Sequence, residues 1–167
     1  MEAIPGRGPD EQITAFVAGH GSRMLGSITL VASNRQEAED ALAEAVGRAW
    51  DHLRRGRSID SLEAWIFVVA SNELRRSARR RLGRPAPPPT ATSMEDTPDL
   101  GPAALGAAVR ALPTRQRQVI VLRYWFDLPL ADIAAALSVA EGTVKAHLHQ
   151  ARSALRTQLA ASEGAVL

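Results

Sequence analysis

A proline-rich segment in the middle of the chain limits what the chain can fold into. Residues 83–101, GRPAPPPTATSMEDTPDLG, contain five prolines, which break helices and strands. Acidic residues outnumber basic ones in this segment, and its composition is typical of a flexible linker. We therefore expect two domains, residues 13–82 and residues 102–160, with a disordered N-terminus over 1–12 and a tail over 161–167.

Both flanking parts have the periodicity of helices. Apolar residues recur every three or four positions, and alternating strand-like patterns are nearly absent. Aromatic residues make up only 4% of the chain, and a chain rich in Ala and Arg favours small helical bundles over sheets. The sequence therefore predicts an all-α fold of two small helical domains. Helices are expected over roughly 13–31, 36–53 and 61–82 in the first domain, which would form a three-to-four-helix bundle.

Several classes of function are disfavoured by what the sequence lacks. It has no cysteine, hence no disulfide, thiolate zinc site or cysteine nucleophile. The four histidines show neither ligand nor triad spacing, and no phosphate-binding or nucleophile motif is present. No apolar run approaches the length of a membrane span or a signal sequence. We expect a soluble intracellular protein that is not an enzyme and has no catalytic residues, metal, cofactor or small-molecule substrate.

The C-terminal part carries the spacing of a helix-turn-helix. Leu130, Ile133, Ala134 and Leu137 form one apolar stripe, and residues 138–140 interrupt it. A second stripe follows in Val144, Leu148, Ala151, Leu155 and Leu159. Two short-linked helices with a shared core are what this motif requires, and a support helix beginning near Thr114, its expected cap, precedes them.

The side of the second helix that faces away from its apolar stripe is a candidate DNA-binding surface. Small side chains allow close approach to the major groove, and basic ones bind phosphates. An ordinary solvated helix face has a similar composition, so the spacing leaves both alternatives open. Lys145, Arg152 and Arg156 form a basic flank. The other candidates for DNA contact are Gly142, Thr143, Ala146, His149, Gln150 and Ser153.

The second half of the helix expected over 61–82 is strongly basic. Asn72 opens it, and no acidic residue follows Glu73 in this helix. We expect a rigid ridge of uncompensated arginines that binds a phosphate backbone, with a merely solvated face as the alternative. Leu74, Ala78 and Leu82 are expected to keep this half attached to the core. The arginines are Arg75, Arg76, Arg79, Arg80 and Arg81.

An acidic pair, Asp40 and Glu44, lies one turn apart on the helix expected over 36–53. Like charges at this spacing destabilise a helix by about 0.2–0.5 kcal/mol unless something neutralises them. Arg48, one turn further on, can pair with Glu44 and leave a plain solvated face. A docking surface for a basic partner is the other alternative. A metal site is disfavoured, because no third ligand stands at the required spacing.

Several motifs, taken together, resemble the extracytoplasmic-function (ECF) RNA polymerase sigma factors of the sigma-70 family, which contain regions 2 and 4 only. Leu112-Pro113, RQR, the LR-Y pair, DIA and EGTVK occur in the order and spacing of region 4. AEDALAEAVGRAW, from Ala38 to Trp50, resembles region 2.2, and LEAWIFVVASNELRRSARRR resembles regions 2.3 and 2.4. A Pro-rich linker between two helical domains is also typical of that family.

The resemblance implies three contact surfaces. Asp40, Glu44 and Arg48 would bind core RNA polymerase. The minus-ten element and an unstacked base of the melted non-template strand would be bound by Asn72, Arg75, Arg76, Arg79 and Arg80. The minus-thirty-five element of double-stranded promoter DNA would be read by Gly142, Thr143, Lys145, Ala146, His147, His149, Gln150 and Arg152.

The same resemblance implies the protein's surroundings. We expect a monomer when free, with an anti-sigma factor as a possible further partner, in the bacterial cytoplasm and at the nucleoid through RNA polymerase. The family often has arginine where His147 and Gln150 stand and glutamine at Ala43, which predicts weaker phosphate and polymerase contacts here. A conventional dimeric helix-turn-helix transcription regulator is the alternative, but it leaves the N-terminal bundle unexplained.

Overall fold

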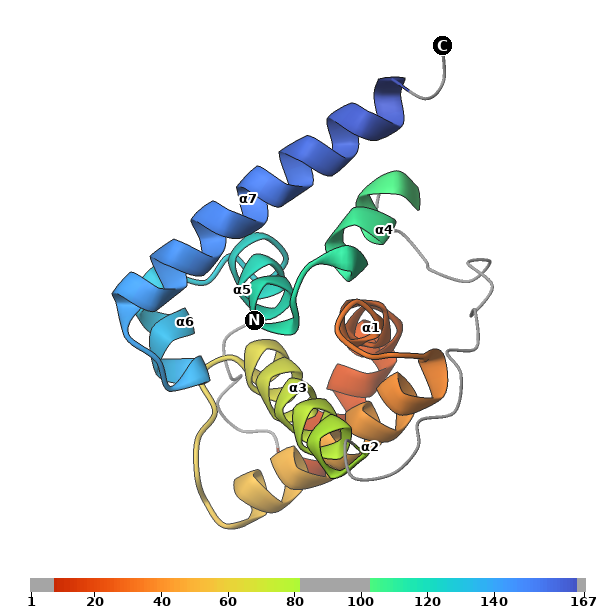
Figure 1. Ribbon diagram of the computed structural model, residues 1–167. Helices are drawn as coiled ribbons and strands as arrows, with labels where there is room; N and C mark the ends of the chain where they lie inside the picture. Colours follow the sequence, from red (N-terminus) through yellow and green to blue (C-terminus); the bar gives the residue numbers. More distant parts are fainter. Residues whose placement is uncertain (1–7, 82–102, 165–167) are drawn as a thin grey trace. The chain divides into compact units, whose positions relative to one another are not determined.

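The computed structural model describes residues 8–81 and 103–164, and within these ranges it contains seven α-helices and no strand (Figure 1). The predicted all-α fold is therefore confirmed. The chain divides into two compact units, within residues 1–98 and 99–167. The predicted linker, residues 83–101, lies outside the described residues, and the two units are described separately.

The N-terminal unit is a bundle of three helices, α1 (Pro9–Thr29), α2 (Arg35–Arg54) and α3 (Leu62–Arg81). Helix α2 packs against both α1 and α3. Its buried side consists of alanines three or four residues apart, and such small side chains allow the neighbouring helices to approach closely. Larger side chains from α1 and α3 fill the rest of the core. The core residues include Phe16, Met24, Ile28, Ala38, Ala41, Ala45, Ala49, Ile66, Phe67 and Ala70.

The start of α1 differs from the prediction. Helix α1 begins at Pro9 instead of near residue 13, because proline is favoured in the first turn and Asp10 accepts a hydrogen bond from Trp50 of α2. Residues 9–12 are therefore helical, not disordered. Ser61 caps α3, since its hydroxyl accepts a hydrogen bond from the Ala64 amide at 3.3 Å.

The C-terminal unit contains four helices, α4 (Ala103–Ala111), α5 (Thr114–Tyr124), α6 (Leu130–Leu137) and α7 (Glu141–Gly164). Helix α7 packs against each of the other three. Ser138 ends α6 in the left-handed region (φ 54°), a common way for helices to stop, and α7 starts three residues later. The predicted helix-turn-helix is thus formed by α6 and α7. Its core includes Val119, Leu122, Ile133, Leu137, Val144, Leu148 and Ala151.

Three expectations about individual positions are wrong. Ala78, expected to keep the basic half of α3 attached to the core, is exposed. Thr114 does not cap α5, because Pro113 occupies the cap position and the Thr114 hydroxyl accepts a hydrogen bond from Arg117. Helix α7 continues to Gly164 and so includes residues that were expected to form a tail.

Two kinds of feature are not found in residues 8–81 and 103–164. No helix there has the length and apolar character needed to cross a membrane. No cluster of three or more His, Asp or Glu side chains there is arranged to hold a metal ion.

Candidate polymerase and nucleic-acid interfaces

The acidic pair of the sequence lies on the exposed face of α2. Each carboxylate has a local partner one turn away. Gln36 donates a hydrogen bond to Asp40 at 3.0 Å, and Arg48 Nε donates one to Glu44 at 2.8 Å. The predicted Glu44–Arg48 pair is therefore present. A groove between α2 and α3, which we call the acidic groove, is lined by Glu37, Asp40, Ala41, Glu44, Glu73, Leu74 and Ser77.

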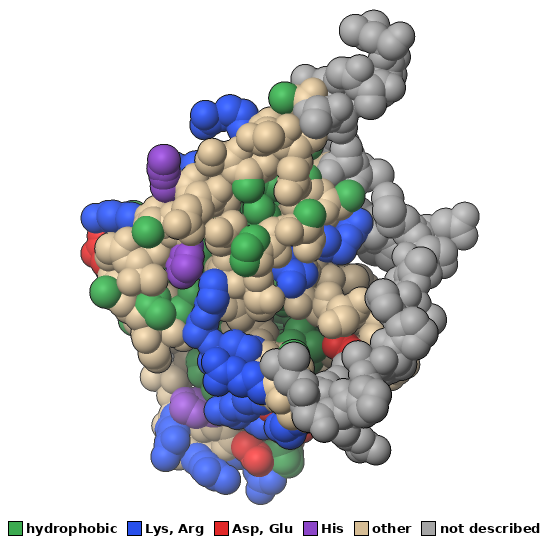
Figure 2. All heavy atoms as spheres, in the orientation of Figure 1, with side chains coloured by type: hydrophobic (Ala, Val, Ile, Leu, Met, Phe, Trp, Pro, Cys, Tyr) green, Lys and Arg blue, Asp and Glu red, His purple; other side chains and the backbone are tan. Residues whose placement is uncertain are grey.

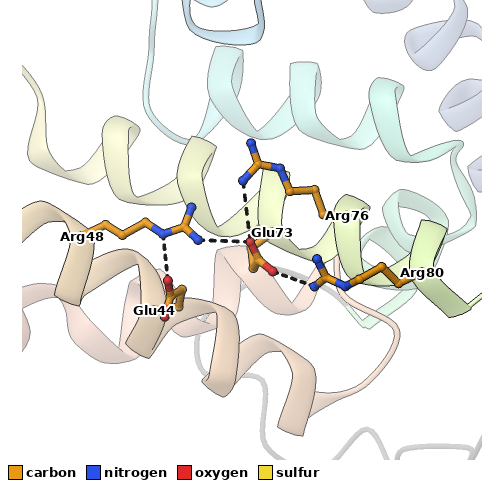
Figure 3. A network of polar contacts seen from close by, with 5 residues as sticks. All are labelled: Glu44, Arg48, Glu73, Arg76 and Arg80. Atoms are coloured by element: carbon orange, nitrogen blue, oxygen red, sulfur yellow. Dashed lines mark hydrogen bonds and ion pairs between the residues drawn. The ribbon is translucent and has the colours of Figure 1, made fainter.

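The carboxylate of Glu73, on α3, contacts arginines from both α2 and α3 (Figure 3). Its Oε1 accepts a hydrogen bond from Arg80 at 2.9 Å. Its Oε2 lies 3.3 Å from a guanidinium nitrogen of Arg48 and 3.9 Å from one of Arg76. The hydrogen bond from Arg80, helped by the charges of Arg48 and Arg76, holds the pKa of Glu73 below its usual value, although partial burial opposes this shift. Glu73 is therefore a carboxylate that stays ionised among these cations.

This arrangement corrects one expectation about the basic half of α3. The arginine ridge was expected to be uncompensated, but Arg76 and Arg80 are both paired with Glu73. No acidic residue follows Glu73 in α3, but Glu73 itself lies close enough to pair with both arginines. Positions three and seven residues further along a helix lie on the same face as Glu73, so the carboxylate serves arginines on its C-terminal side.

The remaining residues of the ridge differ in exposure. Arg76, Arg79 and Arg80 are exposed, whereas Asn72 and Arg75 are partly buried. Figure 2 shows basic side chains gathered over α3 and over the connection between α2 and α3. That connection contributes the exposed Arg55 and Arg57, which the predicted site omitted. The basic run RRGR, residues 54–57 at the end of α2, could have indicated these two arginines in the sequence.

The predicted DNA-reading residues of α7 share one exposed face, with one exception. His147 is only half-exposed, and its Nδ1 is buried without a hydrogen-bond partner among the described residues. The structure therefore does not bring His147 together with the others. The exposed residues are Gly142, Thr143, Lys145, Ala146, His149, Gln150 and Arg152.

A basic groove runs along one flank of α7. It adds Arg123 of α5 and Arg156 of α7 to the predicted site. Arg156 was visible in the sequence as part of the basic flank, whereas Arg123 comes from another helix and had no such signal. Arg123 is held in place by the Asp127 carboxylate and the Leu128 carbonyl, at 3.2 and 3.1 Å. The groove is lined by Arg123, Leu130, Lys145, Leu148, His149, Arg152, Ser153 and Arg156.

Two contacts from α5 hold side chains of the DNA-reading face. Gln116 donates a hydrogen bond to Gln150 Oε1 at 3.2 Å. Arg152 Nε donates one to the Tyr124 hydroxyl at 2.6 Å. The support helix therefore positions polar side chains of α7 as well as packing against its apolar side.

Comparison with known proteins gives the class of the two units. Residues 16–84 match the family model for sigma-70 region 2, and residues 103–155 match the model for sigma-70 region 4. The match to region 2 accounts for the N-terminal bundle, which a conventional helix-turn-helix regulator would leave unexplained. The fold and the two matches define a protein of the sigma-70 class with regions 2 and 4.

Individual relatives narrow this class. The chain is 39% identical over 132 residues to the ECF RNA polymerase sigma factor SigL of Mycobacterium tuberculosis, covering 74% of this chain and 75% of that protein. It is 28% identical over 153 residues to the RNA polymerase sigma-E factor of Streptomyces coelicolor, covering 89% of this chain and 86% of the relative. The chain belongs to the ECF RNA polymerase sigma factor family.

Solved structures agree with this fold. The sigma factor RpoE of Bartonella quintana, solved in complex with the anti-sigma factor NepR, is similar with a TM-score of 0.69 and 22% identity, over 89% of this chain and 96% of that one. CnrH, solved with the cytosolic domain of CnrY, is similar with a TM-score of 0.61 and 21% identity, over 93% of this chain and 91% of that one.

Proposed function

We propose that this protein is a transcription initiation factor that binds core RNA polymerase, recognises minus-thirty-five and minus-ten promoter elements, and melts promoter DNA. Membership of the ECF sigma factor family is the observation that carries this proposal. The surfaces of the two units support it, because an acidic groove and two basic surfaces suit one basic protein partner and two stretches of DNA. The protein is not an enzyme in this proposal, since its partner performs the polymerisation.

The acidic groove of α2 and α3 is the proposed polymerase-binding surface. Asp40 and Glu44 lie on its exposed edge, and Leu74 and Ala41 provide an apolar floor. A basic helix of the polymerase can place cations against these carboxylates and aliphatic parts of its side chains against the floor. Arg48 orients Glu44 through its 2.8 Å hydrogen bond and is therefore a positioning residue of this surface.

The arginine face of α3 is the proposed minus-ten surface. Exposed guanidinium groups neutralise phosphates, and Asn72 and Arg75 lie nearer the bundle. Capture of an unstacked base costs a few kcal/mol, so binding of the flipped base and opening of the duplex are energetically one step. In this proposal Asn72, Arg75, Arg76, Arg79 and Arg80 bind the melted non-template strand.

Helix α7 is the proposed minus-thirty-five reader. Gly142 and Ala146 permit close approach to the major groove, while Gln150 and His149 offer hydrogen bonds to base edges. Thr143 stands at the exposed start of the helix, and Lys145 and Arg152 lie beside the basic groove, where phosphates would bind. His147 is assigned a supporting role at the edge of this surface because its ring is half-buried.

The two units act together in this proposal. Residues 13–82 form the polymerase and minus-ten domain, residues 102–160 form the minus-thirty-five domain, and the linker of residues 83–101 keeps the second domain near DNA once the first is bound. A tether raises the effective concentration of the second site, so modest contacts on α7 suffice. The free protein is a monomer in the bacterial cytoplasm and reaches the nucleoid with RNA polymerase.

An anti-sigma factor is a further proposed partner. Two of the similar solved structures are complexes, one of the sigma factor RpoE with the anti-sigma factor NepR and one of CnrH with the cytosolic domain of CnrY. By analogy, an inhibitor of this protein would cover one of the surfaces described above. Co-purification of the full chain with such a protein from its own cells would test this.

Run-off transcription tests the main proposal. Core RNA polymerase plus this protein should give discrete transcripts from a genomic promoter library, and core polymerase alone should give none. A conventional regulator would instead bind a palindromic site as a dimer without polymerase. Binding of that kind, together with an absence of polymerase-dependent transcripts, would overturn the proposed function.

A further inference from the structure

We propose that Glu73 is a built-in counter-ion that competes with DNA phosphates for Arg76 and Arg80 and so limits non-specific DNA binding by the free protein. This inference rests on the proposed function, because it assumes that the arginine face of α3 is a DNA-binding surface. It assigns Glu73, an acidic residue outside the predicted contact surfaces, a role in specificity.

The geometry of the network supports this role (Figure 3). The Glu73 side chain is only 22% exposed, whereas the side chains of Arg76 and Arg80 are 60% and 65% exposed. The carboxylate is therefore sheltered between α2 and α3, while the guanidinium groups it holds remain within reach of DNA. A phosphate can approach both arginines, but Glu73 already occupies part of their hydrogen-bonding capacity.

The chemistry of guanidinium explains why the two ligands compete. Arginine binds carboxylates and phosphates with the same fork of N–H donors. Non-specific DNA binding draws its free energy from phosphates that replace the small counter-ions around DNA and protein. An arginine already neutralised by Glu73 contributes less to that exchange than an unpaired one.

Arg48 keeps Glu73 in place for this competition. It bridges Glu44 at 2.8 Å and Glu73 at 3.3 Å, so the carboxylate is anchored to α2 as well as to its own helix. A carboxylate held from one side by α2 cannot follow the arginines outward when a phosphate approaches. Arg79 makes no ion pair with the residues that the structure describes, which leaves it as the internal comparison for Arg76 and Arg80.

The test uses the full chain without polymerase and a labelled mixed-sequence duplex that contains no promoter. Binding is followed by fluorescence anisotropy from about 50 to 300 mM salt, where phosphate contacts dominate the affinity. Glu73→Gln should bind about three- to tenfold more tightly at the lowest salt, with a slope of log affinity against log salt that is steeper by about one or two. Glu39→Gln is the matched control, because it removes one carboxylate and releases one arginine, Arg35, elsewhere on α2.

A double-mutant cycle distinguishes two explanations for tighter DNA binding by Glu73→Gln. Either Glu73 competes with phosphates for Arg76 and Arg80, or the substitution acts only through the general gain of one positive charge. The double substitution Arg76→Gln/Arg80→Gln should weaken binding more in the Glu73→Gln background than in the original protein, by about threefold or more. Arg79→Gln should weaken binding by the same factor in both backgrounds. Circular dichroism melts of each variant check that the bundle is folded.

Three results would overturn the proposal. Glu73→Gln could match Glu39→Gln, it could bind DNA more weakly, or the double substitution could cost the same in both backgrounds. The second result would mean that Glu73 positions the arginines for DNA instead of withholding them. Run-off transcription with the same protein preparations tests the sigma-factor function separately, so failure of one proposal does not mask failure of the other.

Discussion

Arg152 donates a hydrogen bond from Nε to the hydroxyl of Tyr124 at 2.6 Å, and its guanidinium carbon lies 5.5 Å from the centre of the tyrosine ring. The contact joins the end of α5 to the basic flank of α7. Tyr124 is 56% exposed, and Arg152 is also exposed, so the contact lies at the surface of the C-terminal unit. Arg152 therefore enters the basic groove in a fixed direction.

Tyr124→Phe tests the importance of that direction. The substitution keeps the ring under the guanidinium but removes the hydroxyl acceptor. We expect affinity for minus-thirty-five duplex DNA to fall about two- to fivefold, in line with the loss of one hydrogen bond to a charged group at an exposed site. Electrophoretic mobility shift with the full chain and a duplex that contains a cognate minus-thirty-five element measures this affinity. A loss as large as that of Arg152→Ala would contradict this prediction.

Substitutions in the acidic groove should weaken polymerase binding. Asp40→Asn and Glu44→Gln are each expected to reduce affinity for core RNA polymerase severalfold, up to about tenfold, with a larger effect at low salt because exposed charges act mainly on association. Competition against a labelled sigma factor provides the measurement. Glu39→Gln is the control on the same helix, and an equal loss in that variant would show that the effect is not specific to the groove.

Gln150 and Arg156 should affect promoter binding in different ways. Gln150→Ala is expected to relax the preference for one base pair of the minus-thirty-five element, at a cost of about 1–3 kcal/mol. Arg156→Gln should weaken binding to all sequences equally and reduce the salt slope by about one, because it removes a phosphate contact. Selection from a randomised minus-thirty-five library distinguishes the two. Uniform weakening by Gln150→Ala would remove it from base recognition.

The stability of the N-terminal unit should depend on pH through Glu73. Its pKa in the folded protein lies below the usual value, chiefly because of the Arg80 hydrogen bond. Such a group stabilises the fold fully above the ordinary glutamate pKa of about 4.3, and the contribution is lost as the pH falls through the lower folded-state pKa. We expect Glu73→Gln to be less stable than the original protein at pH 7 and the difference to disappear in acid.

Urea unfolding at pH 7 and at a pH below the folded-state pKa measures this difference. Arg35 and Glu39, which pair at 2.8 Å on the exposed part of α2, supply the control. Exposed pairs of this kind contribute at most about 1 kcal/mol and often nothing measurable. A Glu73→Gln variant that matches the original protein in stability at both pH values would show that the network does not stabilise the bundle.

Much of the fold could be predicted from the sequence, because the spacing of apolar residues along a helix identifies its buried side. The spacing of Val144, Leu148 and Ala151 identified the buried side of α7, and all three are buried. Pro9 was misread because proline punctuates loops and also begins helices, and only the hydrogen bond between Trp50 and Asp10 decides between the two.

Buried polar side chains and the polar contacts between helices could not be predicted from the sequence. Gln118 is fully buried in α5, where its side chain accepts a hydrogen bond from Arg115, although glutamine usually marks a surface. The pairing of Arg48 with Glu73 joins residues 25 positions apart and depends on how α2 crosses α3. Tyr124 with Arg152 is a contact of the same type. Periodicity locates the faces of a helix, but it does not show which charge on a neighbouring helix lies opposite.

Arg48 hydrogen-bonds to Glu44 on one helix and lies within ion-pair distance of Glu73 on the next. A ligand that neutralises Glu44 leaves more of the Arg48 guanidinium for Glu73, and therefore less of Glu73 for Arg76 and Arg80. Under the proposed assignment of α2 to RNA polymerase and of α3 to DNA, the two binding events are thermodynamically linked through the Arg48 side chain. Such linkage is reciprocal. RNA polymerase therefore raises the protein's affinity for DNA by the same factor by which DNA raises its affinity for RNA polymerase.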